Sequence, residues 1–135
     1  MVIKQTRILT ALLFAGLFFS CGKNSTPASP DTARGSAYPN ICQTDDGFLM
    51  IWYEGNEHIV MSEFTANGWT KKDTIISSDR FFKNWADLPQ IYHKGEDTLA
   101  VSWLERSGEG TYDYDVKVSM STNRGTDWSN PIIPH

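Results

Sequence analysis

The fold is decided by a nine-residue stretch near the C-terminal end of the chain: Ser121-Thr122-Asn123-Arg124-Gly125-Thr126-Asp127-Trp128-Ser129. Its residue types predict a tight turn between two strands. The short polar side chain of Asn123 can bind backbone groups across the turn, and Gly125 can adopt the positive φ angle that such a turn needs. Trp128 is large enough to anchor the hairpin in a hydrophobic core. Ser121, Asn123, Gly125 and Trp128 are therefore assigned a structural role.

The turn belongs to the second of two copies of one pattern. Pro39-Asn40-Ile41 recurs fifty residues later as Pro89-Gln90-Ile91, and the offset grows toward the C-terminus because the second copy has a longer hairpin at 106–114. Three further pairs align: Trp52 with Trp103, Met61-Ser62 with Met120-Ser121, and Trp69 with Trp128. Short strands repeating at this period are typical of β-propeller blades. A tandem β-sandwich is the alternative, and the matching offsets favour the propeller.

Apolar strands separated by turns fill the chain from residue 37 onward, and no segment shows helical periodicity over ten residues. We expect an all-β fold with two four-stranded antiparallel blades, at 37–76 and 87–133. The expected strands are 37–43, 48–53, 57–64, 69–76, 87–93, 98–105, 112–120 and 126–133. Because propellers close with about four to eight blades, the chain is expected to be the N-terminal part of a longer protein.

The first 36 residues have the layout of a targeting segment and a tether. Lys4 and Arg7 precede an apolar run at 8–19, which predicts a signal peptide over 1–20. This run is shorter than the about 20 apolar residues that span a bilayer core. Cys21 follows it directly, as the lipid-attachment cysteine follows the signal peptide of bacterial lipoproteins. An ordinary secretory signal is the alternative.

Lipid attachment at Cys21 predicts a protein anchored in the bacterial cell envelope, on the periplasmic face or at the outer-membrane surface. Residues 21–36 are rich in Ser, Pro, Gly and Thr, which predicts a flexible tether. With Cys21 carrying lipid, Cys42 has no partner for a disulfide within the chain, and we expect a small buried thiol there.

Composition excludes several classes of function. Of the 12 Lys and Arg residues, Lys4 and Arg7 lie in the first 20, so 10 basic residues face 16 acidic ones in the remainder. An acidic remainder without a basic stripe argues against nucleic acid as a partner. The three histidines have no spacing that suggests a metal cluster, and no phosphate-binding loop is present. We therefore expect no metal and no cofactor.

The stretch Ser121–Ser129 resembles the Asp-box, or BNR repeat, of sialidase-like β-propellers, whose pattern is Ser-x-Asp-x-Gly-x-Thr-Trp. Asn123 stands in the place of the Asp and Asp127 in the place of the Thr. A second stretch, Asn84-Trp85-Ala86-Asp87-Leu88-Pro89, is similar to the start of the second blade in bacterial sialidases, where the Asp projects into the central pocket. The resemblance thus implies that Asp87, with Trp85 beside it, binds the substrate.

The resemblance implies a glycan partner, with sialic-acid-containing glycans among the candidates, but the catalytic residues do not carry over. Sialidases hold the sugar carboxylate with three arginines, and Ala37 and Asn56 stand at the first two positions. The loop that carries the general-acid Asp is missing, and the nucleophile would lie beyond His135. Two hypotheses stay open: an exo-α-sialidase-related glycoside hydrolase in the complete protein, or a non-catalytic glycan-binding propeller module. This chain alone is expected to be inactive under either.

Overall fold

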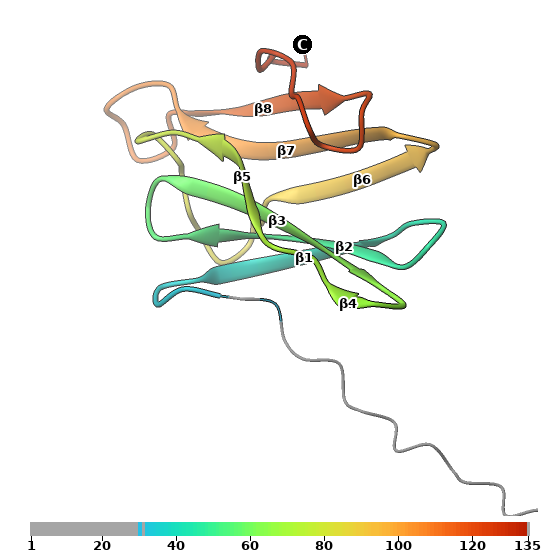
Figure 1. The fold of residues 1–135 in the computed structure, drawn as a ribbon. Coiled ribbons are helices and arrows are strands. Elements are labelled where there is room, and N and C mark those ends of the chain that lie inside the picture. The colour runs from blue at the N-terminus through green and yellow to red at the C-terminus, as the bar shows by residue number, and fades with distance from the viewer. Residues whose placement is uncertain (1–29, 31, 135) are drawn as a thin grey trace, which may run out of the picture.

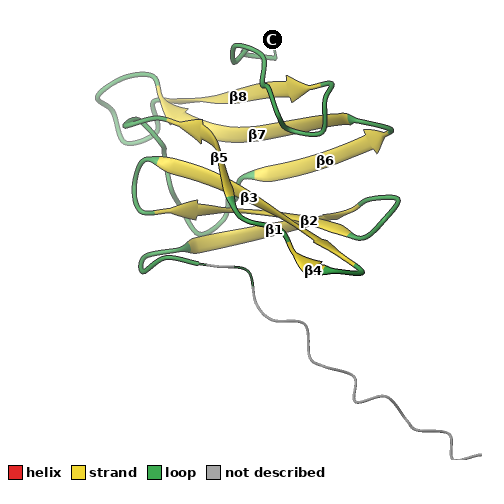
Figure 2. Cartoon of the chain, viewed as in Figure 1, coloured by secondary structure: helices red, strands yellow, loops and turns green. Residues whose placement is uncertain are grey.

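The computed structural model describes residue 30 and residues 32–134 (Figure 1). Every regular element in this part of the chain is a β-strand (Figure 2). The first sheet contains β1 (Ala37–Gln43), β2 (Phe48–Glu54), β3 (His58–Thr65), β4 (Gly68–Trp69) and β5 (Asp73–Ser77). The second sheet contains β6 (Gln90–Gly95), β7 (Thr98–Arg106) and β8 (Tyr114–Ser121). All pairings are antiparallel, so the expected all-β antiparallel architecture is confirmed.

The expected fourth strand of each sheet is only partly formed. In the first sheet it is split, since β4 and β5 pair separately with β3. In the second sheet no strand forms at 126–133, and a single bridge joins Val118 to Ile132. The prediction of a four-stranded second sheet is therefore wrong. The reason is that Pro131 and Pro134, on either side of Ile132-Ile133, have no N–H group to donate to a ladder.

Strand register relates the two sheets residue by residue. In the first sheet Ile41 pairs with Met50, which pairs in turn with Ser62. In the second sheet the corresponding row is Ile91, Val101 and Ser119. Equivalent residues therefore lie 50 apart in the first strand of each sheet, 51 apart in the second and 57 apart in the third. The predicted pairs Ile41/Ile91 and Trp52/Trp103 agree with this register.

Hydrogen bonds support the same equivalence. The hydroxyl of Ser62 donates to the carbonyl of Thr70 at 2.8 Å, and that of Ser119 donates to the carbonyl of Ser129 at 2.7 Å. Ser62 thus corresponds to Ser119, and the alignment of Met61-Ser62 with Met120-Ser121 is wrong by two residues. The repeated Met-Ser dipeptide misled the alignment because the turn after β8 is two residues longer than the turn after β3.

The hydrophobic core lies between the two sheets. The first sheet contributes Leu49, Ile51 and Tyr53 from one face of β2, and the second contributes Leu99, Val101 and Trp103 from β7. The residues of β2 that correspond to these three from β7 are Phe48, Met50 and Trp52, which lie on the opposite face of the first sheet because side chains alternate along a strand. The two sheets therefore pack head to tail, with unlike faces in contact.

The two turn tryptophans are equivalent in register but differ in their surroundings. Trp128 packs against the core cluster between the sheets. Trp69 packs on Phe64, with ring centroids 5.2 Å apart, on the outer face of the first sheet. The expectation of equivalent core positions is therefore correct for the register and wrong for the environment, because head-to-tail packing buries this face in one sheet only.

Candidate functional site

The loop before β6 positions Asp87. The side-chain carbonyl of Asn84 accepts hydrogen bonds from the backbone N–H groups of Ala86, at 2.7 Å, and Asp87, at 2.8 Å. The side-chain amide of Asn84 also donates to the Asp87 carboxylate at 2.9 Å. The strand expected to start at residue 87 begins instead at Gln90. Asp87 thus lies in a loop whose shape is set by Asn84.

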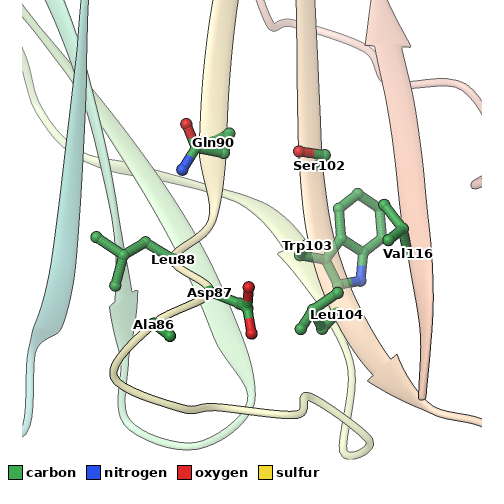
Figure 3. A pocket seen from close by; sticks show the side chains of 8 residues that line it. All are labelled: Ala86, Asp87, Leu88, Gln90, Ser102, Trp103, Leu104 and Val116. Carbon is green, nitrogen blue, oxygen red and sulfur yellow. The ribbon is translucent and has the colours of Figure 1, made fainter.

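Asp87 lines a hollow of about 200 Å³ on the outer face of the second sheet (Figure 3). Figure 3 shows its carboxylate pointing from the loop toward β7. Gln90 and Ser102 add an amide and a hydroxyl to the wall. The remaining lining residues are Ala86, Leu88, Trp103, Leu104 and Val116. Hydrogen-bonding groups beside apolar surface suit a ligand that has hydroxyl groups and a carbon skeleton.

Trp85, which was expected beside Asp87 in the pocket, lies in the same loop but is 86% exposed. It does not line the hollow. The structure therefore brings Asp87 together with Gln90 and Ser102, two residues that sequence reasoning did not select, and leaves Trp85 in solvent. Gln90 was visible in the sequence only as the repeat partner of Asn40.

No arginine or lysine is among the described residues that line the hollow. Ala37 begins β1 and Asn56 lies in the β2–β3 turn, so neither of the two positions expected to hold a clamping arginine supplies a cation. Lys83, in the link between β5 and β6, donates a hydrogen bond to the carbonyl of Gly55 instead of lining the hollow. Its ammonium also lies 4.7 Å from the centre of the Tyr53 ring. Burial lowers the pKa of Lys83.

Sequence reasoning missed a buried cluster around Tyr53. Burial, together with the charge of Glu105, raises the pKa of Tyr53 to about 12. The Tyr53 hydroxyl has no hydrogen-bond partner among the described residues, and its ring packs edge to face on Phe81. The cluster joins β2, the β5–β6 link and β7, so no local spacing in the sequence indicated it.

The stretch Ser121–Ser129 folds as its residue types predict. Ser121 Oγ accepts hydrogen bonds from the backbone N–H of Gly125 at 2.8 Å and from that of Asn123 at 3.3 Å. Asn123 Oδ1 accepts from the N–H of Asp127 at 2.9 Å, and Asn123 Nδ2 donates to the Asp127 carboxylate at 2.9 Å. The indole of Trp128 donates to the carbonyl of Gly125, whose φ angle is 85°. The motif is thus a closed network that holds a turn.

The amide of Asn123 makes two different contacts with Asp127. An amide accepts through its oxygen and donates through its nitrogen. Asn123 therefore makes the acceptor contact that an Asp would make, and its second contact is supplied by the acid at position 127. The carboxylate of Asp127 thus closes the network from the far end of the turn.

Several sequence predictions lie at or beyond the edge of the described residues. Cys21 and the signal segment lie outside them. The structure finds no helix in 30 and 32–134 that is long and apolar enough to cross a membrane. The same residues contain no group of three or more His, Cys, Asp or Glu arranged to hold a metal ion. Cys42 is half-buried, and burial raises the pKa of its thiol.

The described end of the expected tether packs on the first sheet. Pro30, Thr32 and Ser36 line an apolar groove together with Trp52. The backbone N–H of Ala33 donates to the carboxylate of Glu54 at 3.1 Å. This segment therefore covers the end of the outer face on which Trp52 lies.

Comparison with known proteins finds no matching family model, no matching curated protein and no matching solved structure.

Proposed function

We propose that this chain is a glycan-binding module of the sialidase-like β-propeller type, carried by a lipid-anchored protein of the bacterial cell envelope. The observation that carries the proposal is the hollow lined by Asp87, Gln90 and Ser102. We also propose that this chain does not hydrolyse sialosides.

The chemistry of the hollow favours the neutral part of a glycan. The Asp87 carboxylate accepts hydrogen bonds from sugar hydroxyls, and charge-assisted bonds of this kind are about twice as strong as neutral ones. Gln90 and Ser102 can both donate and accept. A sugar carboxylate would meet the like charge of Asp87 with no cation in the described lining to offset it. A neutral hexose or hexosamine residue is therefore the expected ligand.

The absence of clamping arginines argues against sialidase catalysis. Arginine holds a carboxylate through two parallel hydrogen bonds and is always charged, and neither Ala37 nor Asn56 can replace it. Losing one such contact to a desolvated carboxylate costs roughly 2–5 kcal/mol. Two losses are enough to reduce turnover by several orders of magnitude.

The propeller assignment rests on three features taken together: the repeat of one sheet pattern, the Asp-box network and the head-to-tail packing of the sheets. In a propeller each blade packs one face on the next blade in the same sense around a ring. The two sheets described here pack in that sense. We also propose that further sheets, packed in the same sense, complete the ring in the assembled protein.

A titration with oligosaccharides tests the binding site. Lactose, N-acetyllactosamine and 3′-sialyllactose are added to the isotopically labelled chain, and backbone amide shifts are followed by NMR. We expect shifts at Ala86, Gln90 and Ser102 that saturate with a neutral sugar and disappear in Asp87→Ala. Asp45→Ala, in the exposed β1–β2 turn, is the matched control and should bind like the unchanged chain. Binding that is unaffected by Asp87→Ala would refute the site.

An activity assay separates binding from hydrolysis. The purified chain is incubated with a fluorogenic sialoside, and we expect no release above the buffer blank. Turnover that disappears in Asp87→Ala would revive the glycosidase hypothesis and contradict the proposal.

Processing tests the lipid anchor. Globomycin, or the substitution Cys21→Ser, is expected to accumulate the unprocessed precursor in membranes. Unchanged processing in both experiments would refute lipid attachment at Cys21 and leave the ordinary secretory signal.

A further inference from the structure

Two faces of the molecule, one on each sheet, carry exposed apolar patches. The first-sheet patch consists of Ile41, Phe48, Phe64 and Trp69, which together line an apolar groove; Ile41 is 57% exposed and Phe48 is 46% exposed. The second-sheet patch consists of Tyr92, Ala100, Val118 and Met120, which lie on one face of β6, β7 and β8. Tyr92 is 65% exposed and Met120 is 46% exposed. Apolar groups gathered in this way mark an interaction surface.

The first-sheet patch corresponds to a surface that is buried in the second sheet. By strand register, its residues match Ile91, Leu99, Ser121 and Trp128. In the second sheet these residues face the first sheet, where Ile91 is 5% exposed and Leu99 is 1% exposed. The same face is therefore an interface in one sheet and open in the other.

The second-sheet patch corresponds to the other half of the same interface. By register, Tyr92, Ala100, Val118 and Met120 match Cys42, Leu49, Met61 and Glu63. In the first sheet, Leu49 belongs to the core between the sheets, and Cys42 and Met61 pack against it. Each end of the molecule thus presents one of the two face types that already contact each other inside it.

One ion pair of the internal interface is replaced at both ends. Inside the molecule, Arg124 forms an ion pair with Glu63 across the two sheets. On the second-sheet patch Met120 occupies the position that corresponds to Glu63. On the first sheet the turn after β3, Thr65-Ala66-Asn67-Gly68, carries no charged residue in place of Arg124. Both partners of this ion pair are therefore replaced together. Arg124 also lies 3.6 Å from Asp46 in the internal interface, and the β6–β7 turn keeps the acidic residues Glu96 and Asp97 at the corresponding place.

We propose that a second copy of this chain docks its first-sheet patch on the second-sheet patch of the first copy, continuing the internal packing of the sheets. The contact is heterologous, because unlike faces meet, so an open assembly keeps one free first-sheet face at one end and one free second-sheet face at the other. The segment around Pro30 covers only the Trp52 end of the first-sheet face, and leaves the patch open. By register, Ser102 and Leu104 match the core residues Ile51 and Tyr53, so docking covers the hollow lined by Asp87 in every copy except the one whose second-sheet face stays free.

The test uses two variants that each block one patch. Ile41→Glu places a charge on the first-sheet patch, and Met120→Glu places one on the second-sheet patch. Both side chains are about half exposed, so the monomer is expected to fold. Tyr112→Glu is the matched control, because Tyr112 lies in the β7–β8 loop outside both patches and is 82% exposed.

Sedimentation velocity is measured on the full chain and on each variant over a range of concentrations. We expect the unchanged chain and Tyr112→Glu to form oligomers as concentration rises, and Ile41→Glu and Met120→Glu to remain monomeric when measured separately. Mixed in equal amounts, these two variants should form a 1:1 dimer and nothing larger, because each retains the face that the other has lost.

Three outcomes would overturn the proposal. The unchanged chain remains monomeric at its highest soluble concentration; or Met120→Glu alone forms dimers, which would show that like faces pair; or the mixture stays monomeric. Association through the N-terminal segment, which all four proteins share, would appear equally in every sample and would also count against the docking of the two patches.

Discussion

The turns that close the two sheets differ although they occupy the same place in the repeat. The turn after β8 is held by the side chains of Ser121, Asn123 and Asp127 in a closed network. The turn after β3 is shorter, and its side-chain contacts are the hydroxyl of Thr65 with the N–H of Asn67 at 3.2 Å and with the carbonyl of Gly68 at 3.5 Å. Side-chain hydrogen bonds therefore hold the turn after β8, whereas the turn after β3 is constrained mainly by its short length.

The difference follows from what each turn contacts. At Gly125, an added Cβ would lie 2.6 Å from the end of the Met61 side chain on the facing sheet. At Gly68, an added Cβ would meet nothing within 4 Å. The turn after β8 is thus part of the interface between the sheets, where its shape must fit the facing sheet. The shorter turn lies on an outer face, where no facing sheet restricts its shape.

The largest expected effect compares the two equivalent tryptophans of β2 and β7. Trp103→Ala should lower the free energy of unfolding by about 3–5 kcal/mol, because it opens a cavity in the core between the sheets. Trp52→Ala should cost about 1–2 kcal/mol less, because Trp52 has a buried indole N–H without a partner among the described residues. Urea unfolding of both variants checks this. Equal losses would show that the two faces are packed equally well.

The next effect compares the two turn glycines. Gly125→Ala should destabilise by about 1–2 kcal/mol, since the strain of a positive φ is joined by a close contact that the flexible end of Met61 must move to relieve. Gly68→Ala has the same kind of strain without the contact, and about 1 kcal/mol is expected. Thermal unfolding measures both. A larger loss at Gly68 would contradict the assignment of the turn after β8 to the interface.

A third effect depends on pH and separates Tyr53 from its equivalent Leu104, which does not titrate. The pKa of Tyr53 is raised from 10.0 to about 12, so the folded state keeps the phenolic proton longer than the unfolded state does. The resulting stability is complete below about pH 10 and is lost as pH rises through about 12. We expect the free energy of unfolding to fall by about 1 kcal/mol between about pH 10 and pH 11.

The variant Tyr53→Phe should lack this component of the pH dependence. Tyr92→Phe, at an exposed tyrosine, is the matched control and should keep it. Urea unfolding at several alkaline pH values gives the comparison, and an unchanged slope in Tyr53→Phe would contradict the assignment.

The smallest effect tests the repeat itself. Ser62→Ala and Ser119→Ala each remove one buried hydroxyl that donates to a carbonyl after the turn. Each should cost about 1 kcal/mol, and the two losses should agree closely. Chemical denaturation measures them. If Ser62→Ala instead matched Ser121→Ala, the alignment of Met61-Ser62 with Met120-Ser121 would be restored.

The sequence predicted much of the fold because its signals are local. Alternating and continuous apolar runs placed six of the long strands within a few residues of their observed bounds, and the turn at Ser121–Trp128 was predicted from residue types that bind their own backbone. The strand at 126–133 was predicted wrongly. The apolar pattern there favours a strand, but Pro131 and Pro134 lack the N–H groups that a ladder needs, and only a single bridge forms.

The candidate site was predicted less completely. Asp87 was selected from the sequence, and the structure places it in a hollow. Gln90 and Ser102 were not selected, because they come from neighbouring strands and meet only when β6 pairs with β7. Trp85 was expected in the pocket, and its neighbour Asn84 folds the loop so that Asp87 faces the sheet while Trp85 remains in solvent.

The sequence by itself determined the strands, the turns and the existence of a repeat, because each depends on side chains that act on their own backbone or alternate along one strand. Only the tertiary structure decided which face of each sheet is buried. That choice depends on the packing of one sheet against the other, and it gives equivalent residues such as Phe48 and Leu99 opposite surroundings. Residues that share a register position can therefore form a core in one sheet and an open surface in the other.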